Sequence, residues 1–304
     1  MNKSGLLAAA TITLAIAAPS HAETLLIDSF EDGDFSTPSG YSFQWGSPNR
    51  TTIVSEEGVY SNGQLSIAKP SGRDWKAKDG DFSLRFRYPA GQAQSEQRFQ
   101  IGGAHRDIWF QYWVRVPTNY SHGGSSPSNH KFFAAWMDDY SSKGNGPTVA
   151  WEFWGSGGGS SNLAFHYSDG GYTVMGGHKQ YTDFISVPND RGRWMEITIH
   201  LKASSSGSSS DGVIELWRRW EGESASQRKQ LHKTTSAVLP VPSGGPNGWA
   251  AGYLMGWANA AYSQDTEWLL DRIVVSTESL LGSNGGGGEG SPGNAPTAPG
   301  PYLE

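Results

Sequence analysis

Cationic and amide side chains share strand faces in two short segments of the sequence. Arg85 and Arg87 lie on one face of an expected strand, because successive side chains of a β-strand point to opposite faces. By the same alternation, Asn129 and Lys131 share a face, and His130 points to the other. Guanidinium, ammonium and amide groups bind carboxylates. The two segments therefore predict contact with an anionic ligand.

A third segment adds a phenol and a further amide. Tyr253, Trp257 and Asn259 fall on one side of a late expected strand. If the three faces line one concave sheet, the cleft holds what β-elimination on a uronic acid requires. This reaction removes the C5 proton beside the sugar carboxylate, so the carboxylate must be neutralised, a base must take the proton, and an acid must protonate the departing O4 oxygen.

These roles can be divided among the candidate side chains. Arg87 would neutralise the carboxylate, with Arg85 and Asn129 binding the substrate beside it. Lys131 would be the base if neighbouring Arg charges and partial desolvation lower its pKa, and the Tyr253 hydroxyl would donate to the leaving oxygen. A solvated lysine at a strand edge is the alternative for Lys131.

Aromatic and histidine side chains predict the rest of a sugar-binding groove. The sequence has 13 Trp, and a flat indole packs against the C–H face of a sugar ring while its N–H bonds to hydroxyls. We expect Trp136 and Trp257 in the groove, with His130 and His166 as further substrate contacts. Burial in the core of a large sandwich is the alternative for each of them.

An acidic run follows the first expected strand. Glu31 and Asp34 lie in this run, and Asp271 lies in the last expected strand. Hard oxygen ligands close to a glycine turn suit Ca²⁺, so these three carboxylates are the expected ligands of a structural calcium ion. The spacing is not that of an EF-hand loop, and a solvated acidic turn is the alternative.

The strands that must position these residues follow from periodicity. Apolar and polar residues alternate with period two, and clusters of Gly, Ser, Asn, Asp and Pro separate the alternating segments. Many strands and few helices predict an all-β fold of two packed sheets. The expected strands are Thr24–Ser29, Gln64–Ala68, Phe82–Tyr88, Asp107–Val116, His130–Trp136, Thr148–Trp154, Asn162–Tyr167, Trp194–Lys202, Gly212–Arg219, Ala251–Ala258 and Glu267–Ser276.

The three reactive segments resemble the signature strands of jelly-roll polysaccharide lyases: an Arg-rich strand, a Gln-x-His strand, and a late strand running from Tyr through Gly to Asn. Alginate lyases, heparin lyase I, glucuronan lyases and the jelly-roll ulvan lyases share this architecture. Lys131 stands where the histidine of Gln-x-His would be, which is closer to the ulvan lyases, in which a Lys and a Tyr act together.

The resemblance implies a fold and an activity. The fold is a β-jelly roll, a concanavalin A-like two-sheet sandwich, and many such carbohydrate proteins bind one structural Ca²⁺ between the N-terminal loop and the final strand. The activity is β-elimination on a uronic-acid polysaccharide, with ulvan as the first expected substrate and alginate or glucuronan as alternatives.

Two other functions fit parts of the sequence. A glycoside hydrolase needs two carboxylates about 5 to 10 Å apart, and Glu152 with Glu196 or Asp138 would supply them, although no Glu-x-Asp-x-x-Glu cluster is present. A non-catalytic carbohydrate-binding module would use the same aromatic groove. Reducing ends without an unsaturated product would indicate the hydrolase, and binding without product would indicate the module.

The two ends of the chain differ in composition from the rest. Residues 1–22 have the charge, apolar run and small-residue exit of a secretory signal peptide, and residues 281–304 have the Gly- and Pro-rich composition of a linker or tail. We therefore expect one catalytic domain at residues 23–280, secreted to the periplasm or the medium as a monomer. The tail suggests a further C-terminal module.

Composition narrows the partners. A net charge of −6 argues against a general nucleic-acid binder, and no stretch after residue 22 is long and apolar enough for a membrane span. The absence of Cys excludes disulfides and thiolate chemistry. An acidic polysaccharide is the partner that we expect.

Overall fold

The computed structural model describes residues 23–124, 127–140, 145–170 and 174–282, with the backbone alone for 174–180 and 182. The expected signal peptide and nearly all of the expected tail lie outside these residues, so both stay predictions. Within the described ranges, no helix could cross a lipid bilayer.

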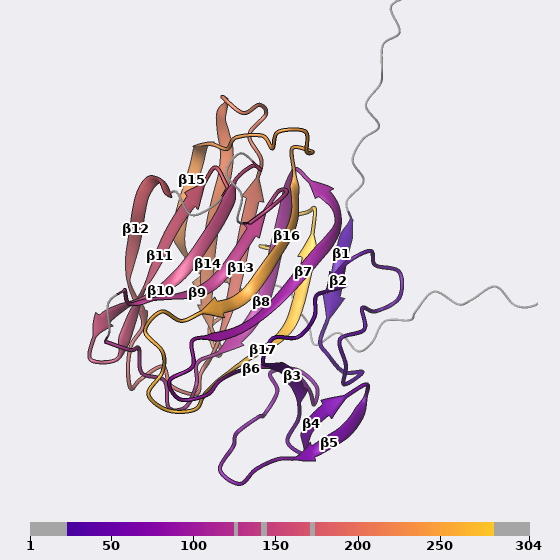
Figure 1. Ribbon diagram of the computed structural model, residues 1–304, viewed down its shortest axis with the longest axis vertical. Helices are drawn as coiled ribbons and strands as arrows, with labels where there is room; N and C mark the ends of the chain where they lie inside the picture. Colours follow the sequence, from indigo (N-terminus) through magenta and orange to yellow (C-terminus); the bar gives the residue numbers. More distant parts are fainter. Residues whose placement is uncertain (1–22, 125–126, 141–144, 171–173, 283–304) are drawn as a thin grey trace, which may run out of the picture.

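Two antiparallel sheets pack face to face, which confirms the all-β jelly-roll prediction (Figure 1). In the described chain, sheet A runs in the order β15 (Lys229–Val238), β14 (Ser210–Trp220), β13 (Trp194–Lys202), β8 (Asp107–Arg115), β17 (Thr266–Ser276), β6 (Ser83–Tyr88), β3 (Thr51–Val54), β4 (Gly58–Ser61) and β5 (Gln64–Ala68), and β1 (Thr24–Asp28) also pairs with β17. Sheet B runs in the order β12 (Val174–Ile185), β11 (Ser160–Ser168), β10 (Thr148–Gly157), β9 (Asn129–Trp136), β16 (Trp249–Trp257), β7 (Gln94–His105) and β2 (Gln44–Trp45).

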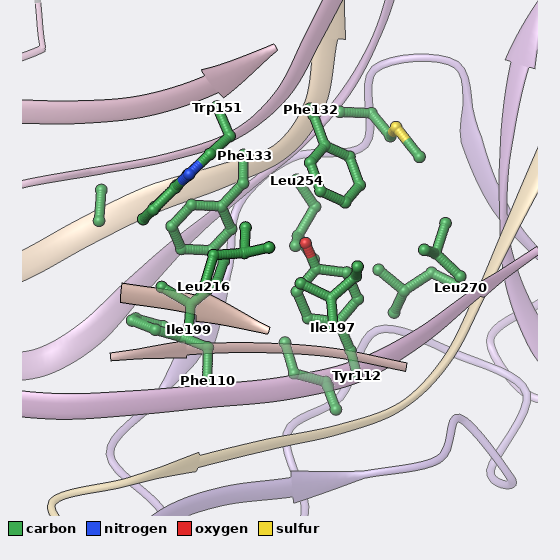
Figure 2. Packing of buried hydrophobic residues seen from close by; sticks show 14 of the residues in the cluster. Phe110, Tyr112, Phe132, Phe133, Trp151, Ile197, Ile199, Leu216, Leu254 and Leu270 are labelled. Carbon is green, nitrogen blue, oxygen red and sulfur yellow. The ribbon is translucent and has the colours of Figure 1, made fainter. Parts of the chain in front are cut away.

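The core fills the space between the sheets. Phe110 and Tyr112 of β8 point from sheet A toward Phe133 of β9 and Trp151 of β10 in sheet B (Figure 2). These side chains are almost completely buried, and period-two alternation places the other residues of each strand on its outer face. The outer face of sheet B is therefore separated from the outer face of sheet A by the whole core.

A β-bulge in β9 sets the side-chain directions near its start. Lys131 pairs with Glu152 of β10, but the next pair along the strand joins Phe133 to Trp151, so Phe132 is the extra residue. Phe132 and Phe133 both enter the core. The bulge thus lets two consecutive aromatic rings pack inward while Lys131 stays on the outer face.

Every expected strand is present, with ends that differ by three residues at most. The structure also has strands that periodicity did not predict, namely β2, β3, β4, β7, β12 and β15. Among these, β7 lies next to the edge strand β2 of sheet B and pairs with β16 on its other side.

Candidate functional site

Three polar side chains surround a buried carboxylate on the outer face of sheet B. Glu152 of β10 is fully buried, and its Oε1 contacts the Nζ of Lys131. Asn129 donates from Nδ2 to Oε2 of Glu152 at 3.0 Å, and Nδ1 of His166 lies 4.0 Å from the same oxygen. We name Asn129, Lys131, Glu152 and His166 the Glu152 cluster.

Strand register explains how the Glu152 cluster assembles. Lys131 is the direct cross-strand partner of Glu152 on β9, and Asn129 is the next outward residue on the same strand. On the other side of β10, His166 of β11 pairs with Ala150, one outward position from Glu152. Three adjacent strands thus place two donors and one imidazole around one carboxylate.

The charge state of Glu152 follows from its surroundings. Burial acts to raise the pKa of Glu152, but the charges of Lys131 and His166 and the hydrogen bonds from Lys131 and Asn129 outweigh burial and hold the pKa below its usual value. Glu152 is therefore ionised near neutral pH. An ionised carboxylate in contact with Lys131 also favours the charged ammonium form of that lysine.

Gly256 of β16 lets Lys131 lie close to the neighbouring strand. Its φ is +144°, and a Cβ at this position would lie 2.9 Å from the Cβ of Lys131 and 3.3 Å from Oε2 of Glu96. Any side chain here would push Lys131 away from the sheet. Lys131 of β9 and Glu96 of β7 therefore both lie close to Gly256, on the two sides of β16.

Aromatic side chains form the neighbouring part of the face. Tyr253 of β16 is 1% exposed, and its hydroxyl lies 3.3 Å from the hydroxyl of Tyr140, which follows β9. Trp136 packs beside both rings. Burial raises the pKa of Tyr253 well above 10, so its hydroxyl keeps its proton at neutral pH. The Tyr253 hydroxyl, paired with that of Tyr140, is therefore a neutral proton donor.

A cation that the sequence did not predict stands beside this donor. Arg98 of β7 is the cross-strand partner of Tyr253, and its guanidinium lies 5.8 Å from the ring of Trp136. Its Nε donates to Oε1 of Glu96 at 2.7 Å, and more than half of the side chain is exposed. Arg98 therefore supplies on this face the arginine that was expected from Arg85 and Arg87.

Two further expected residues lie at the edge of the Glu152 cluster. Asn259 donates from Nδ2 to Oδ1 of Asn129 at 2.7 Å. Trp257 is 49% exposed at the end of β16. The structure thus gathers Lys131, Tyr253 and most of the expected substrate contacts on one face.

The expectation that Arg85 and Arg87 lie on the same sheet as Lys131 and Tyr253 is wrong. Both lie on β6, which pairs with β3 and β17 in sheet A, on the far side of the core. Arg85 lies over the ring of Trp75 at 4.8 Å and is 3.4 Å from Glu267, and Arg87 pairs with Asp265 at 3.2 Å. Alternation predicts the face of a strand correctly, but it does not say which sheet the strand joins.

The expectation that His130 contacts substrate is also wrong. His130 points into the core, where its Nε2 bonds to the carbonyl of Ala260 at 2.6 Å and its Nδ1 lies 3.1 Å from the hydroxyl of Tyr262. A carbonyl oxygen only accepts, so the histidine carries its proton on Nε2, and Tyr262, which itself accepts a hydrogen bond from Trp268, donates to Nδ1. Burial and the neighbouring His122 lower the pKa of His130 to about 3. His130 is therefore a neutral structural group behind the site.

Comparison with solved structures of the alginate lyase Aly36B supports the fold. The alginate lyase Aly36B, in a doubly substituted variant with an alginate tetrasaccharide, aligns with a TM-score of 0.55 and 12% identity over 82% of this chain and 95% of that chain. Another Aly36B structure aligns with a TM-score of 0.50 and 14% identity over 75% and 97%. The alginate lyase vAL-1 from Chlorella virus aligns with a TM-score of 0.47 and 10% identity over 77% and 92%. No family model and no curated protein matches the sequence.

The carboxylate pairs expected for a hydrolase are not supported by the geometry. Glu196 lies on β13 of sheet A, where it binds Arg219 and Arg228 at 2.6 Å each. Glu152 lies on the opposite sheet, so these two carboxylates cannot flank one glycosidic bond. Asp138 follows the end of β9, and its Cβ lies near Gly245, away from the Glu152 cluster at the start of that strand.

The expected calcium ligands do not form one set of three carboxylates. Glu31 and Asp271 accept hydrogen bonds from backbone N–H groups of the same loop, residues 78–82. Asp34 instead accepts from the N–H of Ser36 in its own turn, at 2.6 Å. Throughout the described ranges, no group of three His, Asp or Glu side chains is arranged to hold a metal ion. The prediction that Asp34 completes the set is wrong.

One oxygen atom near Glu31, Oδ1 of Asp271, is nonetheless suited to bind a cation. Oδ1 of Asp271 is buried and has no hydrogen-bond partner among the described residues. Burial raises the pKa of Asp271 to about 7, and the charge of Glu31 adds to this effect. A cation beside Oδ1 would satisfy the atom and offset the repulsion between the two carboxylates.

Proposed function

We propose that the chain is a polysaccharide lyase that cleaves a uronate polymer at the Glu152 cluster. The main support is that Lys131, held by the ionised Glu152, lies one strand and one outward position away from the Tyr140 and Tyr253 hydroxyl pair. The fold also matches Aly36B, an alginate lyase whose variant structure, with one lysine and one tyrosine replaced, holds an alginate tetrasaccharide.

The roles proposed for the side chains follow from their charge. Lys131 and Arg98 supply positive charge for the uronate carboxylate, and Asn129 adds an amide donor. The Tyr253 hydroxyl, which lies beside that of Tyr140, is protonated at neutral pH, so it can donate a proton to the departing O4 oxygen. Trp257 and Asn259 at the edge would contact neighbouring sugars.

A panel of uronate polymers tests the activity. Incubation with alginate, ulvan, glucuronan and heparin is expected to produce, with at least one polymer, the ultraviolet absorbance of a C4–C5 unsaturated uronate. Alginate is the first substrate to test because of the structural likeness to Aly36B, and ulvan is the second because of the Lys and Tyr motif. Reducing ends without this absorbance would indicate hydrolysis, and binding without product would indicate a carbohydrate-binding module.

Arg98 and Arg87 give a matched pair of variants. Arg98→Ala is expected to raise KM by about 10- to 100-fold, because a charge-assisted hydrogen bond to the substrate contributes about 1.5–3 kcal/mol. Arg87→Ala on sheet A is expected to leave KM unchanged. Steady-state kinetics on the preferred polymer measure both values. A raised KM in Arg87→Ala with an unchanged KM in Arg98→Ala would instead indicate that the substrate binds the outer face of sheet A.

We also propose that Ca²⁺ binds between Glu31 and Asp271 as a structural ion. A hundredfold excess of Ca²⁺ over its Kd is expected to raise Tm by about 5–10 °C, because ligand binding to the folded state alone stabilises it by about 2.7 kcal/mol under these conditions. Asp271→Asn should abolish the shift in thermal unfolding. Asp34→Asn is the matched control and should retain it. An equal shift in the wild type and in Asp271→Asn would contradict this site.

A further inference from the structure

A hollow lies between three connections at one end of the sandwich, and we name it the Arg191 hollow. Its volume is about 330 Å³, which falls within the range of small-ligand sites. None of the residues that line it is acidic, and one of them, Arg191, is cationic. The other lining residues carry hydroxyl or amide groups, and they include Asn119, Ser121, Tyr262, Ser263 and Gln264.

Arg191 has hydrogen-bond donors to spare for an anion. Its Nε donates to the carbonyl of Tyr120 at 2.8 Å, which uses one of the five N–H donors of a guanidinium. The neighbouring carboxylate, Asp190, pairs instead with Arg193 at 2.7 Å. Among the described residues, Arg191 forms no ion pair. Its two terminal nitrogens can therefore bind a carboxylate in the paired geometry that guanidinium groups favour.

A second hollow, of about 180 Å³, shows the opposite electrostatics. It shares Asn119 with the Arg191 hollow and contains two arginines, Arg73 and Arg115. Arg115 lies 2.6 Å from Asp74 and Arg73 lies 3.6 Å from Glu267, and both carboxylates line the same hollow. Its positive charges are thus neutralised where they stand, so an anion gains little by entering it.

The connection between β16 and β17 links the Arg191 hollow to the outer face of sheet B. It begins there beside the exposed Trp257, and Asn259 binds Asn129 of the Glu152 cluster at 2.7 Å. Tyr262, three residues further along, already lines the hollow. Three residues span at most about 11 Å, so a long ligand on the Glu152 cluster that extends past Asn259 reaches the hollow.

We propose that the Arg191 hollow is a distal subsite that binds a further uronate residue of the same polymer, away from the bond that is cleaved; this deepens the proposed lyase function and rests on it for the identity of the ligand. A uronate residue carries one carboxylate and several hydroxyls. Arg191 binds the carboxylate, and the hydroxyl and amide groups around it bind the sugar hydroxyls. The subsite makes the protein prefer long anionic chains to short ones.

Chain length tests the subsite. The substrates are a tetrasaccharide and an octasaccharide of the preferred polymer, or of alginate if no polymer is cleaved. Arg191→Ala is expected to raise KM for the octasaccharide by about tenfold, because a charge-assisted hydrogen bond is lost. KM for the tetrasaccharide should stay within about twofold of the wild type, and kcat should be unchanged, because binding away from the cleaved bond affects KM alone.

Two further variants separate charge from structure. Ser263→Glu places a carboxylate in the hollow and leaves the bond from Arg191 to Tyr120 in place, so it should raise KM for the octasaccharide as Arg191→Ala does. Arg73→Ala, in the neighbouring hollow, is the control and should change KM for neither substrate. A rise in Arg191→Ala that Ser263→Glu does not share would assign the effect to the bond with Tyr120 and overturn the subsite.

The remaining outcomes distinguish the subsite from the proposed function. An unchanged KM for the octasaccharide in Arg191→Ala, or an equal rise for both lengths, overturns the subsite and leaves the lyase function standing. If the wild type forms no unsaturated product from any uronate polymer, the lyase function fails, and isothermal titration with the two alginate oligosaccharides tests the hollow by itself. Tighter binding of the octasaccharide that both Arg191→Ala and Ser263→Glu lose supports the subsite, and equal binding in all three proteins overturns it.

Discussion

Replacing Lys131 with methionine is expected to lower the free energy of unfolding by about 3–5 kcal/mol at pH 8, because the substitution leaves a buried carboxylate without its counter-ion. Methionine keeps most of the length and apolar contact of the lysine side chain, so the loss reports charge rather than packing. Glu152 is fully buried and Lys131 is 18% exposed, so solvent screens this pair only weakly. Urea denaturation measures the change.

The loss in Lys131→Met should depend on pH. In the wild type the pKa of Glu152 is lowered, so its stabilising contribution is present above the ordinary carboxyl pKa and is lost as pH falls. In Lys131→Met, burial dominates and the carboxylate destabilises the fold only where it is ionised. The difference between wild type and variant should therefore be smaller at pH 4 than at pH 8.

An exposed ion pair supplies the matched control. Lys69 contacts Glu56 at 2.6 Å, but the Glu56 side chain is 56% exposed, so Lys69→Met should cost less than about 1 kcal/mol. Adding Glu152→Gln to Lys131→Met should recover part of the stability, because it removes the unpaired charge. Equal losses in Lys131→Met and Lys69→Met would show that the Glu152 cluster is not the buried ion pair described above.

The sequence predicted strands well where each strand separates apolar from polar residues. In β8, Phe110 and Tyr112 face the core while Gln111 and Arg115 face outward, and the expected and observed strand ends nearly coincide. The face assignments of Arg85 and Lys131 were also correct. Their assignment to one sheet could not be made in this way, because pairing between strands far apart in sequence depends on packing that alternation does not encode.

Arg98 was not predicted from the sequence because β7 does not carry apolar residues on one face and polar residues on the other. Its inward residue Gln97 is polar and fully buried, accepting a hydrogen bond from Thr51 at 2.6 Å and donating to the carbonyl of Gly46 at 2.7 Å. Polar side chains thus occur on both faces of the strand, and period-two hydropathy gives no signal. The segment Ser95–Arg98 carries alternating Glu and Arg, which was the available sign that one face was functional.

The centre of the site was visible in the sequence but assigned to another chemistry. Glu152 was expected only as one carboxylate of a hydrolase, since sequence alone does not show that Lys131 and Asn129 surround it. Tyr140 follows the end of β9, and no strand pattern places its hydroxyl against Tyr253. Both residues became recognisable only through contacts between separate strands and turns.

His130 is expected to make the fold sensitive to acid, which is the second large effect. Its pKa is lowered to about 3, whereas an unfolded histidine titrates near 6.5, so the unfolded chain binds the proton first and stability falls as pH drops from about 6.5 toward 3. Between pH 7 and pH 5 this term should cost about 2 kcal/mol. His130→Gln cannot be protonated in this range, and its amide can still donate to the carbonyl of Ala260. Urea denaturation at both pH values should therefore show a wild-type loss about 2 kcal/mol larger than the loss in His130→Gln, and equal losses would mean that His130 accepts its proton without leaving the core.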